Sequence, residues 1–506
     1  MKKITLIIAA LSAIGLSGCK KYLEQAVNPN APSVTTLQLS LTGAEKALAD
    51  IPNGNGSASY GTGLYLQYGF WIGYWAVSSG FIVQPDLSQY VITPSEFQSW
   101  TDLYLNLSNI SALQGIATAQ GAADYSAIAQ IMRAYDFEAL VDQYNDVPYS
   151  QALNPNIIFP AYDKGPAIYA DLIKQLDAAI ATINSNAGAT PPQGDDIIFQ
   201  GNMTNWKKFA NTLKLRLIIR QSNLSNFSTI AADMSTTLKE GFLDGTTEAT
   251  ANPGYTLNDA YGGQESPFWL SYGTSATGAP EDILVKANTY FINKLHGYND
   301  PRLFQLFTTV TDPVTMQTGI VHGLYLGDPT ASQDTNSAAG LSNVGPGLLI
   351  SASMPAVIFS GAESLFLQAE AANDGIIPGS AQTLYQAAIT ASFEEMQVPN
   401  ADAAAATYYS QNIANVGWAA SSANLESAII TQKYIAICGY GNFEAYNEYR
   451  RTGYPSDIPR SLDPAAIGTG IPTRIYYPQV EYNTNGANVG AEGTINEFGS
   501  KIFWAK

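Results

Sequence analysis

Two clusters of aromatic residues are the groups in this chain best suited to binding chemistry. The first cluster, with the polar side chains that follow it, offers as binding residues Trp71, Tyr74, Trp75, Gln84 and Asp86. The second lies in a glycine-rich segment and offers Tyr261, Trp269 and Tyr272. Aromatic rings can stack on the C–H faces of sugars, while amide, carboxylate and hydroxyl groups hydrogen-bond to sugar hydroxyls. The two clusters therefore predict a site for an uncharged polar ligand.

Both clusters also have a purely structural interpretation. Helical spacing would place Trp71, Tyr74 and Trp75 on one face of a helix, where they could pack against a neighbouring helix instead of a ligand. The aromatic residues of the second cluster could fasten a loop onto the scaffold. Trp100 and Trp206 fall within helix-like patterns, and we interpret them as core residues.

No catalytic constellation is recognisable in the sequence. His296 and His322 lack the spacing of metal ligands, and the chain has no HExxH, G-x-S-x-G or GK[ST] motif. A glycosidase needs two carboxylates on either side of the sugar, whereas the adjacent acidic pairs at 195–196 and 394–395 would diverge by about 100° on a helix. We therefore predict no catalytic residue, no metal site and no cofactor, although the sequence leaves calcium binding by an Asp/Asn-rich loop open.

The composition favours neutral ligands. The chain has 24 lysines and arginines against 42 aspartates and glutamates, which gives a formal net charge of −18. Such a field disfavours nucleic acid and anionic membrane surfaces. Only 13% of the residues are charged, while 30 are tyrosines, as suits a surface that handles uncharged polar ligands. Cys438 lies in an apolar run and is predicted to be a small core residue.

The N-terminus has the pattern of a lipoprotein signal. Two lysines precede an apolar run over residues 4–16, which is too short to span a bilayer and is typical of a signal peptide. The sequence Leu-Ser-Gly-Cys at 16–19 matches a lipobox, in which Cys19 is acylated and becomes the mature N-terminus. We predict a signal peptide over 1–18 and a lipidated tether over 19–35. The alternative is an ordinary secretory signal with an incidental cysteine.

Apolar residues recur at helical spacing through much of the chain. The predicted helices cover residues 37–50, 100–110, 128–140, 168–180, 206–220, 362–373, 381–396 and 425–451. Paired helices of this length suggest hairpins that stack, although no 34-residue period is visible. Segments 245–280 and 315–355, rich in Gly, Ser, Asn and Thr, give no helical pattern. The predicted fold is mainly α: a tetratricopeptide-like scaffold of helical hairpins with a large irregular, loop-rich layer.

Arginines inside these apolar helices require partners. The four that stand out are Arg216, Arg220, Arg450 and Arg451. A buried charge persists only when it is paired, so each is expected to meet a carboxylate, with Glu363, Glu370 and Glu448 as candidates. Gly453 and Pro455 are expected to end the last of these helices.

Five ordered motifs resemble those of the SusD/RagB family, the surface glycan-capturing lipoproteins of Bacteroidetes. They are DQYNDVPYSQAL at 142–153, PAYD at 160–163, WKKFANTLKLR at 206–216, ESLFLQAEA at 363–371 and NEYRRTGYP at 447–455. Asn145 stands where the family usually has glycine, and asparagine also tolerates left-handed backbone. After Cys19 only Glu24 represents the acidic cluster often associated with surface export in these lipoproteins.

The resemblance implies a function as well as a fold. It implies one SusD-like helical domain over 36–506 that is not an enzyme. Such a protein binds glycans and delivers them to a partner SusC-like TonB-dependent transporter. It is anchored by lipid to the outer membrane and faces outside. The alternatives are a secreted glycan-degrading hydrolase and a peptide-capturing member of the same family. The matched motifs are interpreted as scaffold, so the resemblance assigns no individual ligand contact.

Overall fold

The structure is a computed structural model that describes residues 35–54, 66–81, 83–96, 99–186, 190–259, 263–331 and 338–506. The predicted signal peptide, Cys19, nearly all of the tether and Tyr261 lie outside the described residues, so the expectations for them stay predictions. Within the described ranges, no helix is both long enough and apolar enough to cross a membrane.

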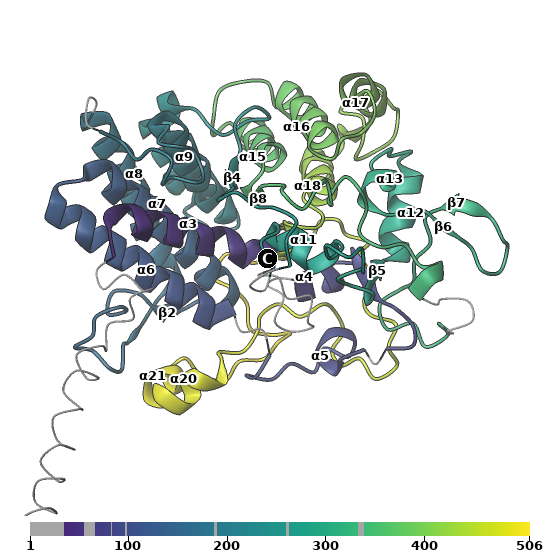
Figure 1. Cartoon of the computed structure of the whole chain (residues 1–506), viewed down its shortest axis with the longest axis horizontal. Helices are drawn as coiled ribbons and strands as arrows, with labels where there is room; N and C mark the ends of the chain where they lie inside the picture. Colours follow the sequence, from purple (N-terminus) through teal and green to yellow (C-terminus); the bar gives the residue numbers. More distant parts are fainter. Residues whose placement is uncertain are drawn as a thin grey trace, which may run out of the picture.

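The long helices pack in sequence order into two groups (Figure 1). The first group consists of α3 (Leu37–Asn53), α6 (Ser99–Gln120), α7 (Ala123–Tyr144), α8 (Gly165–Ser185) and α9 (Met203–Arg220). The second consists of α15 (Gly361–Asn373), α16 (Ala381–Glu395), α17 (Ala401–Tyr409) and α18 (Leu425–Ala436). Each of α6, α7 and α8 contacts the next helix, α15 contacts α16 and α16 contacts α17, and α15 joins the groups by contacting α9. The mainly helical fold is as predicted.

Short elements and irregular segments fill the right and the bottom of the view in Figure 1. The remaining α-helices are α4 (Leu66–Trp71), α5 (Pro85–Ser88), α10 (Phe227–Ala232), α11 (Pro267–Tyr272), α12 (Thr289–Gly297), α13 (Leu303–Leu306), α19 (Asn442–Thr452), α20 (Gln479–Thr484) and α21 (Gly486–Ala491). The 3₁₀ helices are η1 (Asp233–Thr236), η2 (Leu238–Glu240), η4 (Ala338–Gly340) and η5 (Ala419–Ser421). The segments without a helical pattern contribute α11, β4, β7 and η4 to this layer.

The strands occur as antiparallel pairs. They are β1 (Trp75–Val77) with β5 (Val285–Ala287), β2 (Val147–Pro148) with β3 (Tyr162–Asp163), β4 (Ala249–Ala251) with β8 (Ala356–Phe359), and β6 (Val310–Thr311) with β7 (Thr318–Ile320). In the first pair Trp75 lies opposite Ala287. Each pair joins segments of the irregular layer or fastens them to the helices; β8, for example, contacts α3.

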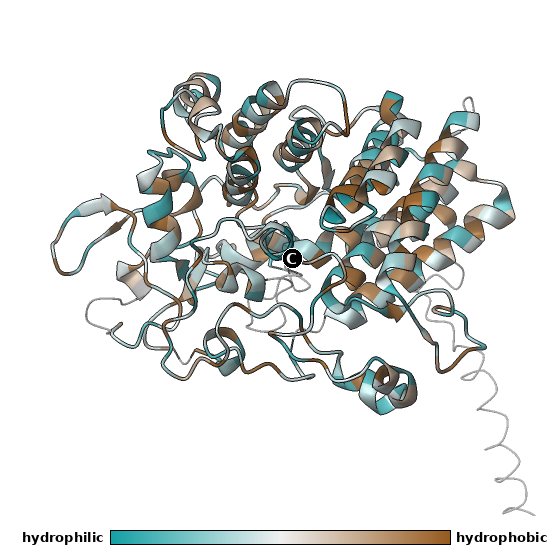
Figure 2. Cartoon of the chain, turned by 180° about the vertical axis from the view of Figure 1, so that it is seen from behind, coloured by the Kyte–Doolittle hydropathy of each residue, from teal (hydrophilic) through white to brown (hydrophobic). Residues whose placement is uncertain are grey.

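Side-chain caps and apolar faces explain where the helices begin and why they pack. Thr36, Asn202, Ser360 and Asn424 accept hydrogen bonds from backbone N–H groups in the first turns of α3, α9, α15 and α18. Figure 2 shows hydrophobic residues mixed with hydrophilic ones on the long helices, and one buried cluster runs through both groups. Burial of this apolar surface is the main favourable contribution to the fold.

The prediction of a single helix over residues 425–451 is wrong, because two helices occupy this stretch. The first, α18, ends at Ala436, and α19 begins at Asn442. Gly439 lies between them with φ +102°, a backbone conformation that glycine adopts far more readily than other residues. The apolar spacing continues across this turn, which is why periodicity alone joined the two helices. The predicted end is confirmed, since Gly453 caps α19 in the left-handed conformation.

A buried carboxyl group of α3 should make stability depend on pH. Glu45 is fully buried, and its Oε2 accepts a hydrogen bond from Ile197 N at 2.7 Å. Burial raises the pKa of Glu45 well above 4.5, and the charge of Asp196 adds to the rise. The native state therefore holds a proton that the unfolded chain releases above about pH 4.5.

Glu45→Gln should consequently become more stable relative to wild type as the pH rises above about 4.5. The gain should approach about 1.4 kcal/mol per pH unit and level off above the native pKa of Glu45. Urea unfolding of both proteins between pH 4 and pH 9 measures this difference. A stability difference that does not change with pH would show that Glu45 is ionised in the native state.

Candidate functional site

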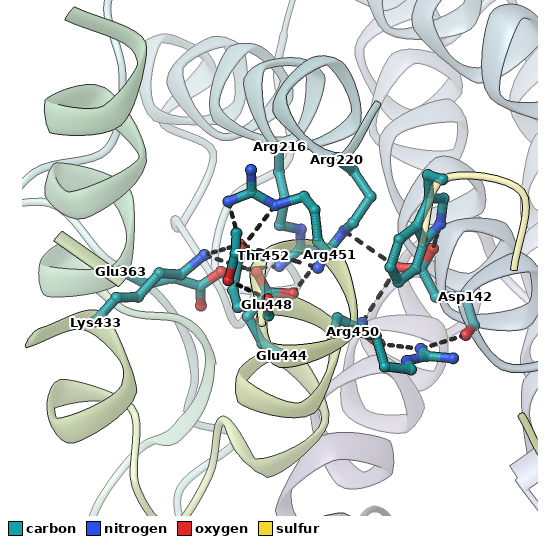
Figure 3. Close-up of polar contacts among 12 residues, drawn as sticks. Asp142, Arg216, Arg220, Glu363, Lys433, Glu444, Glu448, Arg450, Arg451 and Thr452 are labelled. Carbon is teal, nitrogen blue, oxygen red and sulfur yellow. Dashed lines mark hydrogen bonds and ion pairs between the residues drawn. The ribbon is translucent and has the colours of Figure 1, made fainter. Parts of the chain in front are cut away.

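Four of the five motifs that resemble the SusD/RagB family, all except PAYD at 160–163, contribute to a buried network of ion pairs (Figure 3). Arg216 of α9 binds Glu138 of α7 through two hydrogen bonds, with Nε–Oε1 and NH2–Oε2 distances of 3.0 and 2.5 Å. The same guanidinium donates to Glu363 of α15 at 3.2 Å. Neighbouring Arg220 donates to Glu444 of α19. These contacts tie helices from distant parts of the chain together.

Glu448 and Arg451 of α19 form the centre of the network. The guanidinium of Arg451 donates to both oxygens of Glu370 at 2.7 and 2.9 Å, and its Nε donates to Glu448 at 2.8 Å. Lys433 of α18 donates to Glu444 at 2.7 Å and to Glu448 at 2.8 Å. The expectation that the buried arginines meet carboxylates, with Glu363, Glu370 and Glu448 as candidates, is therefore confirmed for Arg216 and Arg451.

The electrostatics of the network indicate a structural role. Burial raises the pKa of Glu138 and of Glu370 to about 7 even against the arginines beside them. Burial also acts on Glu448, but Arg451, Lys433 and Arg220 outweigh it and hold its pKa well below 4.5. The cavity at the network measures only about 50 Å³, far below the size of an ordinary ligand pocket.

Two residues of the matched motifs, Arg450 and Asn145, take no part in these ion pairs. Arg450 forms no ion pair with any of the described residues. It donates to the carbonyl oxygens of Asp142 and Thr473 at 2.6 and 3.0 Å and lies over the ring of Tyr446. Its charge is thus held by backbone dipoles and an aromatic face. Asn145 has φ +69°, as its replacement of the usual glycine led us to expect.

The first aromatic cluster is not an exposed stacking surface. Trp71, Tyr74 and Trp75 have exposed fractions of 0%, 0% and 2%. They do not share a helix face either, since α4 ends at Trp71, Gly73 turns the chain with φ +82°, and Trp75 begins β1. Tyr74 stacks on Tyr434, with ring centroids 4.5 Å apart. The expectation of a platform is wrong for these three rings, and the packing alternative describes them. Trp100 and Trp206 are buried as predicted.

The polar residues of the first cluster lie apart from those buried rings. Gln84 is exposed at the start of α5, and Asp86 is half-buried in its first turn. Both are accessible for hydrogen bonding, but the aromatic partners predicted for them are in the core. Their role in ligand binding stays a prediction.

The second cluster keeps part of its aromatic surface accessible. Trp269 and Tyr272 are half-buried on α11. The indole of Trp269 lies against the backbone of Gly273, where a Cβ would come within 2.6 Å of the ring, and its Nε1 donates to Thr274 O at 2.9 Å. Tyr272 packs on Phe268, with ring centroids 4.9 Å apart. The structure thus fixes the position of Trp269 without burying it completely.

Several concave surfaces of the described residues are large enough for a ligand. One, of about 480 Å³, is lined mainly by residues of α3 and α6. Three others are lined partly by irregular segments. The first of these three, about 380 Å³, lies between α3 and residues of the 253–255 and 263–270 stretches, to which α11 contributes Pro267 and Leu270. The second, about 350 Å³, contains Glu248, Glu395 and Tyr440 among its lining residues. The third, about 320 Å³, contains Phe81 and Tyr325 among its lining residues. The first is lined in part by α11, the helix that carries Trp269 and Tyr272. Its polar residues on α3 carried no signal in the sequence.

The architecture defines a class of protein. It is a tetratricopeptide-like helical scaffold with concave surfaces that irregular segments line in part, and the ion pairs formed by residues of the matched motifs are buried within it. The chain belongs to the SusD-like family. The model of this family, described as "Starch-binding associating with outer membrane", matches residues 29–478.

Solved structures share the fold over almost the whole chain. A SusD homologue from Bacteroides fragilis is 25% identical, with a TM-score of 0.71 over 93% of this chain and 99% of that one. A SusD-like protein described as Bacteroidetes AC2a is 19% identical, with a TM-score of 0.74 over 93% and 100%. A chitin-binding SusD homologue from Flavobacterium johnsoniae is 23% identical, with a TM-score of 0.71 over 92% and 98%. No curated protein matches the chain.

Proposed function

We propose that this protein is a non-catalytic lipoprotein that binds glycans at the cell surface. The observation that carries the proposal is the match of the SusD-like family model, with its starch-binding description, to residues 29–478. A second support is α11, which carries the accessible Trp269 and lines a cavity of about 380 Å³ through Pro267 and Leu270, because a fixed aromatic ring and a cavity of this size suit a sugar. A structural relative described as chitin-binding points to the same ligand class.

The proposal includes anchorage and delivery. Acylation of Cys19 would hold the protein on the outer membrane, with the binding surfaces facing outside, and the captured glycan would pass to a partner SusC-like TonB-dependent transporter. The support for this part is the lipobox at residues 16–19 together with the family's description as associating with the outer membrane. Labelling of the intact protein with a palmitate analogue, lost in Cys19→Ala, tests the anchor.

A hydrolase is the weaker alternative. Among the concave surfaces described above, the second contains a close carboxyl pair, because Glu395 and Glu248 are within hydrogen-bond contact of each other. Glycosidases separate their two carboxyl groups by about 5 Å or more so that the sugar fits between them. Glu395 instead accepts a hydrogen bond from Ala362 N at 2.7 Å, at the start of α15, which indicates a capping role. Capture of peptides remains the other alternative.

Trp269→Ala should weaken glycan binding by roughly tenfold, which corresponds to about 1.4 kcal/mol. Calorimetry on the soluble form that lacks residues 1–19, with maltoheptaose and chitohexaose as probes, measures the affinity, and a reducing-sugar assay on the same samples measures turnover. Trp418→Ala is the matched control. Trp418 is also half-buried, but it packs on Tyr385 of α16, in the second helix group.

Binding without release of reducing sugar would support the proposal. Release of reducing sugar by the purified protein would overturn it in favour of the hydrolase. Binding of neither glycan, with binding of a peptide library, would favour the peptide-capturing alternative.

A further inference from the structure

The cavity between α3 and the 253–255 and 263–270 stretches, called here the α3 cavity, has hydrogen-bonding groups among its lining residues that the described fold does not use. Its volume is about 380 Å³, and its lining residues include Lys46, Asp50, Tyr255, Glu265 and Leu270. Buried polar atoms normally find partners inside a protein, so each exception requires an explanation. Two such exceptions line this one cavity.

The first exception is the hydroxyl of Tyr255. The exposed fraction of this residue is only 9%, yet its hydroxyl is buried and has no hydrogen-bond partner among the described residues. The backbone around it is held firmly, because Asn252 Oδ1 accepts from the N–H groups of Gly254 and Tyr255 at 2.9 and 3.1 Å. Tyr255 lines the cavity, so its ring holds an unpartnered polar atom at a fixed position next to that space. A phenylalanine would fill the same space without that unsatisfied group.

The second exception is the carboxylate of Asp50. Its Oδ2 accepts from Lys46 Nζ at 2.6 Å, one helical turn away on α3. Its Oδ1 is buried and finds no partner within the described part of the chain. The exposed fractions of the two side chains are 14% for Asp50 and 49% for Lys46. The charge of Asp50 contributes, after burial, to raising the pKa of Tyr255, so the two groups face the same space.

The opposite wall of the cavity is already satisfied. Glu265 Oε1 accepts from Asn258 N at 2.7 Å, and its Oε2 accepts from Gln264 N at 2.8 Å. This carboxylate is therefore committed to holding the loop. It leaves Tyr255 as a donor or acceptor, Asp50 Oδ1 as an acceptor and Lys46 as an exposed donor.

We propose that the α3 cavity is a subsite for two adjacent hydroxyl groups of an uncharged sugar. One hydroxyl donates to Asp50 Oδ1 and accepts from Lys46 Nζ, while its neighbour pairs with the Tyr255 hydroxyl. Leu270, Pro253 and Pro267 line the same cavity and offer apolar surface to the C–H face of the ring. This inference rests on the proposed function, since it names the chemical group that one glycan-binding surface recognises.

Charge selects a neutral sugar over an anionic one. Two carboxylates, Asp50 and Glu265, and one ammonium group line the cavity, and the whole chain carries a formal net charge of −18. A sulfated or uronic-acid ligand would meet like charge at close range, in a site where water screens little. Hydroxyl groups carry no such cost.

The test compares binding with stability. Tyr255→Phe should bind maltoheptaose roughly three- to tenfold more weakly, as for the loss of one hydrogen bond. It should melt at the same temperature as wild type or higher, because the substitution removes a buried group that has no partner in the described fold. Asp50→Asn should weaken binding roughly tenfold or more, since the lost hydrogen bonds involve a charged group.

Tyr104→Phe is the matched control. Its hydroxyl donates to Pro148 O at 2.6 Å, so this variant should melt at a lower temperature and bind maltoheptaose with unchanged affinity. Calorimetry and thermal melts of all four proteins measure both quantities on the soluble form that lacks residues 1–19.

The outcomes separate this inference from the proposed function. Wild-type binding that is unchanged in both Tyr255→Phe and Asp50→Asn would overturn the subsite and leave glycan capture standing. A Tyr255→Phe variant that melts well below wild type would show that the hydroxyl is structural, which also overturns the subsite. If wild type binds neither maltoheptaose nor chitohexaose, the proposed function fails and the subsite fails with it.

Discussion

Arg451→Ala should destabilise the protein by roughly 3–5 kcal/mol, because it leaves the buried carboxylate of Glu370 without its cation and removes one of the cations that pair with Glu448. Arg451 donates to both oxygens of Glu370 and also to Glu448, and all three side chains are buried. A loss of this size is a large share of the stability of an ordinary domain. Urea unfolding, followed by circular dichroism, measures it as a lower midpoint with a similar slope.

An exposed lysine provides the control for charge alone. Lys239, with an exposed side-chain fraction of 79%, lies 3.8 Å from Glu240, and Lys239→Ala should change the stability by no more than about 1 kcal/mol. Combining Arg451→Met with Glu370→Gln should cost less than the sum of the single changes, since no unpaired charge then remains at that position. Equal losses for Arg451→Ala and Lys239→Ala would show that the network does not stabilise the fold.

The parts of the fold that local spacing determines could be predicted from the sequence. Helices such as α8 and α9 carry apolar residues at regular intervals and begin or end at recognisable caps, so their bounds were close to the predicted ranges. The requirement that buried charges be paired was enough to name Glu363, Glu370 and Glu448 as candidate partners of the arginines. It was not enough to match each arginine to its partner or to find Glu138 and Glu444, because charges on separate helices meet only through the tertiary fold.

Exposure of the binding residues could not be predicted in the same way. An aromatic residue has similar local preferences whether its ring faces a ligand or the core, so Trp71 and Trp269 were equivalent in the sequence. The structure separates them: Trp71 is in the core and Trp269 is half-buried. Asp50 carried no signal, because its significance comes from an unpaired oxygen beside Tyr255, a residue distant in sequence.

Trp71→Ala should therefore lower stability instead of removing a binding surface, with an expected loss of roughly 3–5 kcal/mol. The ring of Trp71 is fully buried and makes edge contacts with Tyr68, Tyr90 and Tyr446, with centroid distances of 5.6, 6.3 and 5.9 Å. An alanine leaves a cavity that this packed aromatic cluster cannot fill. Trp71→Phe should cost less, because it keeps most of the contacts.

The comparison with Trp269→Ala makes the prediction decisive. The hypothesis is that buried rings stabilise the fold and accessible rings bind the ligand. Trp71→Ala should then have a lower melting temperature. At a temperature where both variants are folded, it should bind maltoheptaose with wild-type affinity. Trp269→Ala shows the reverse: weaker binding and a nearly unchanged melting temperature. A Trp71→Ala protein that melts like wild type but no longer binds would mean that the α4 region opens to admit a ligand. The first aromatic cluster would then be a binding site despite its burial in this structure.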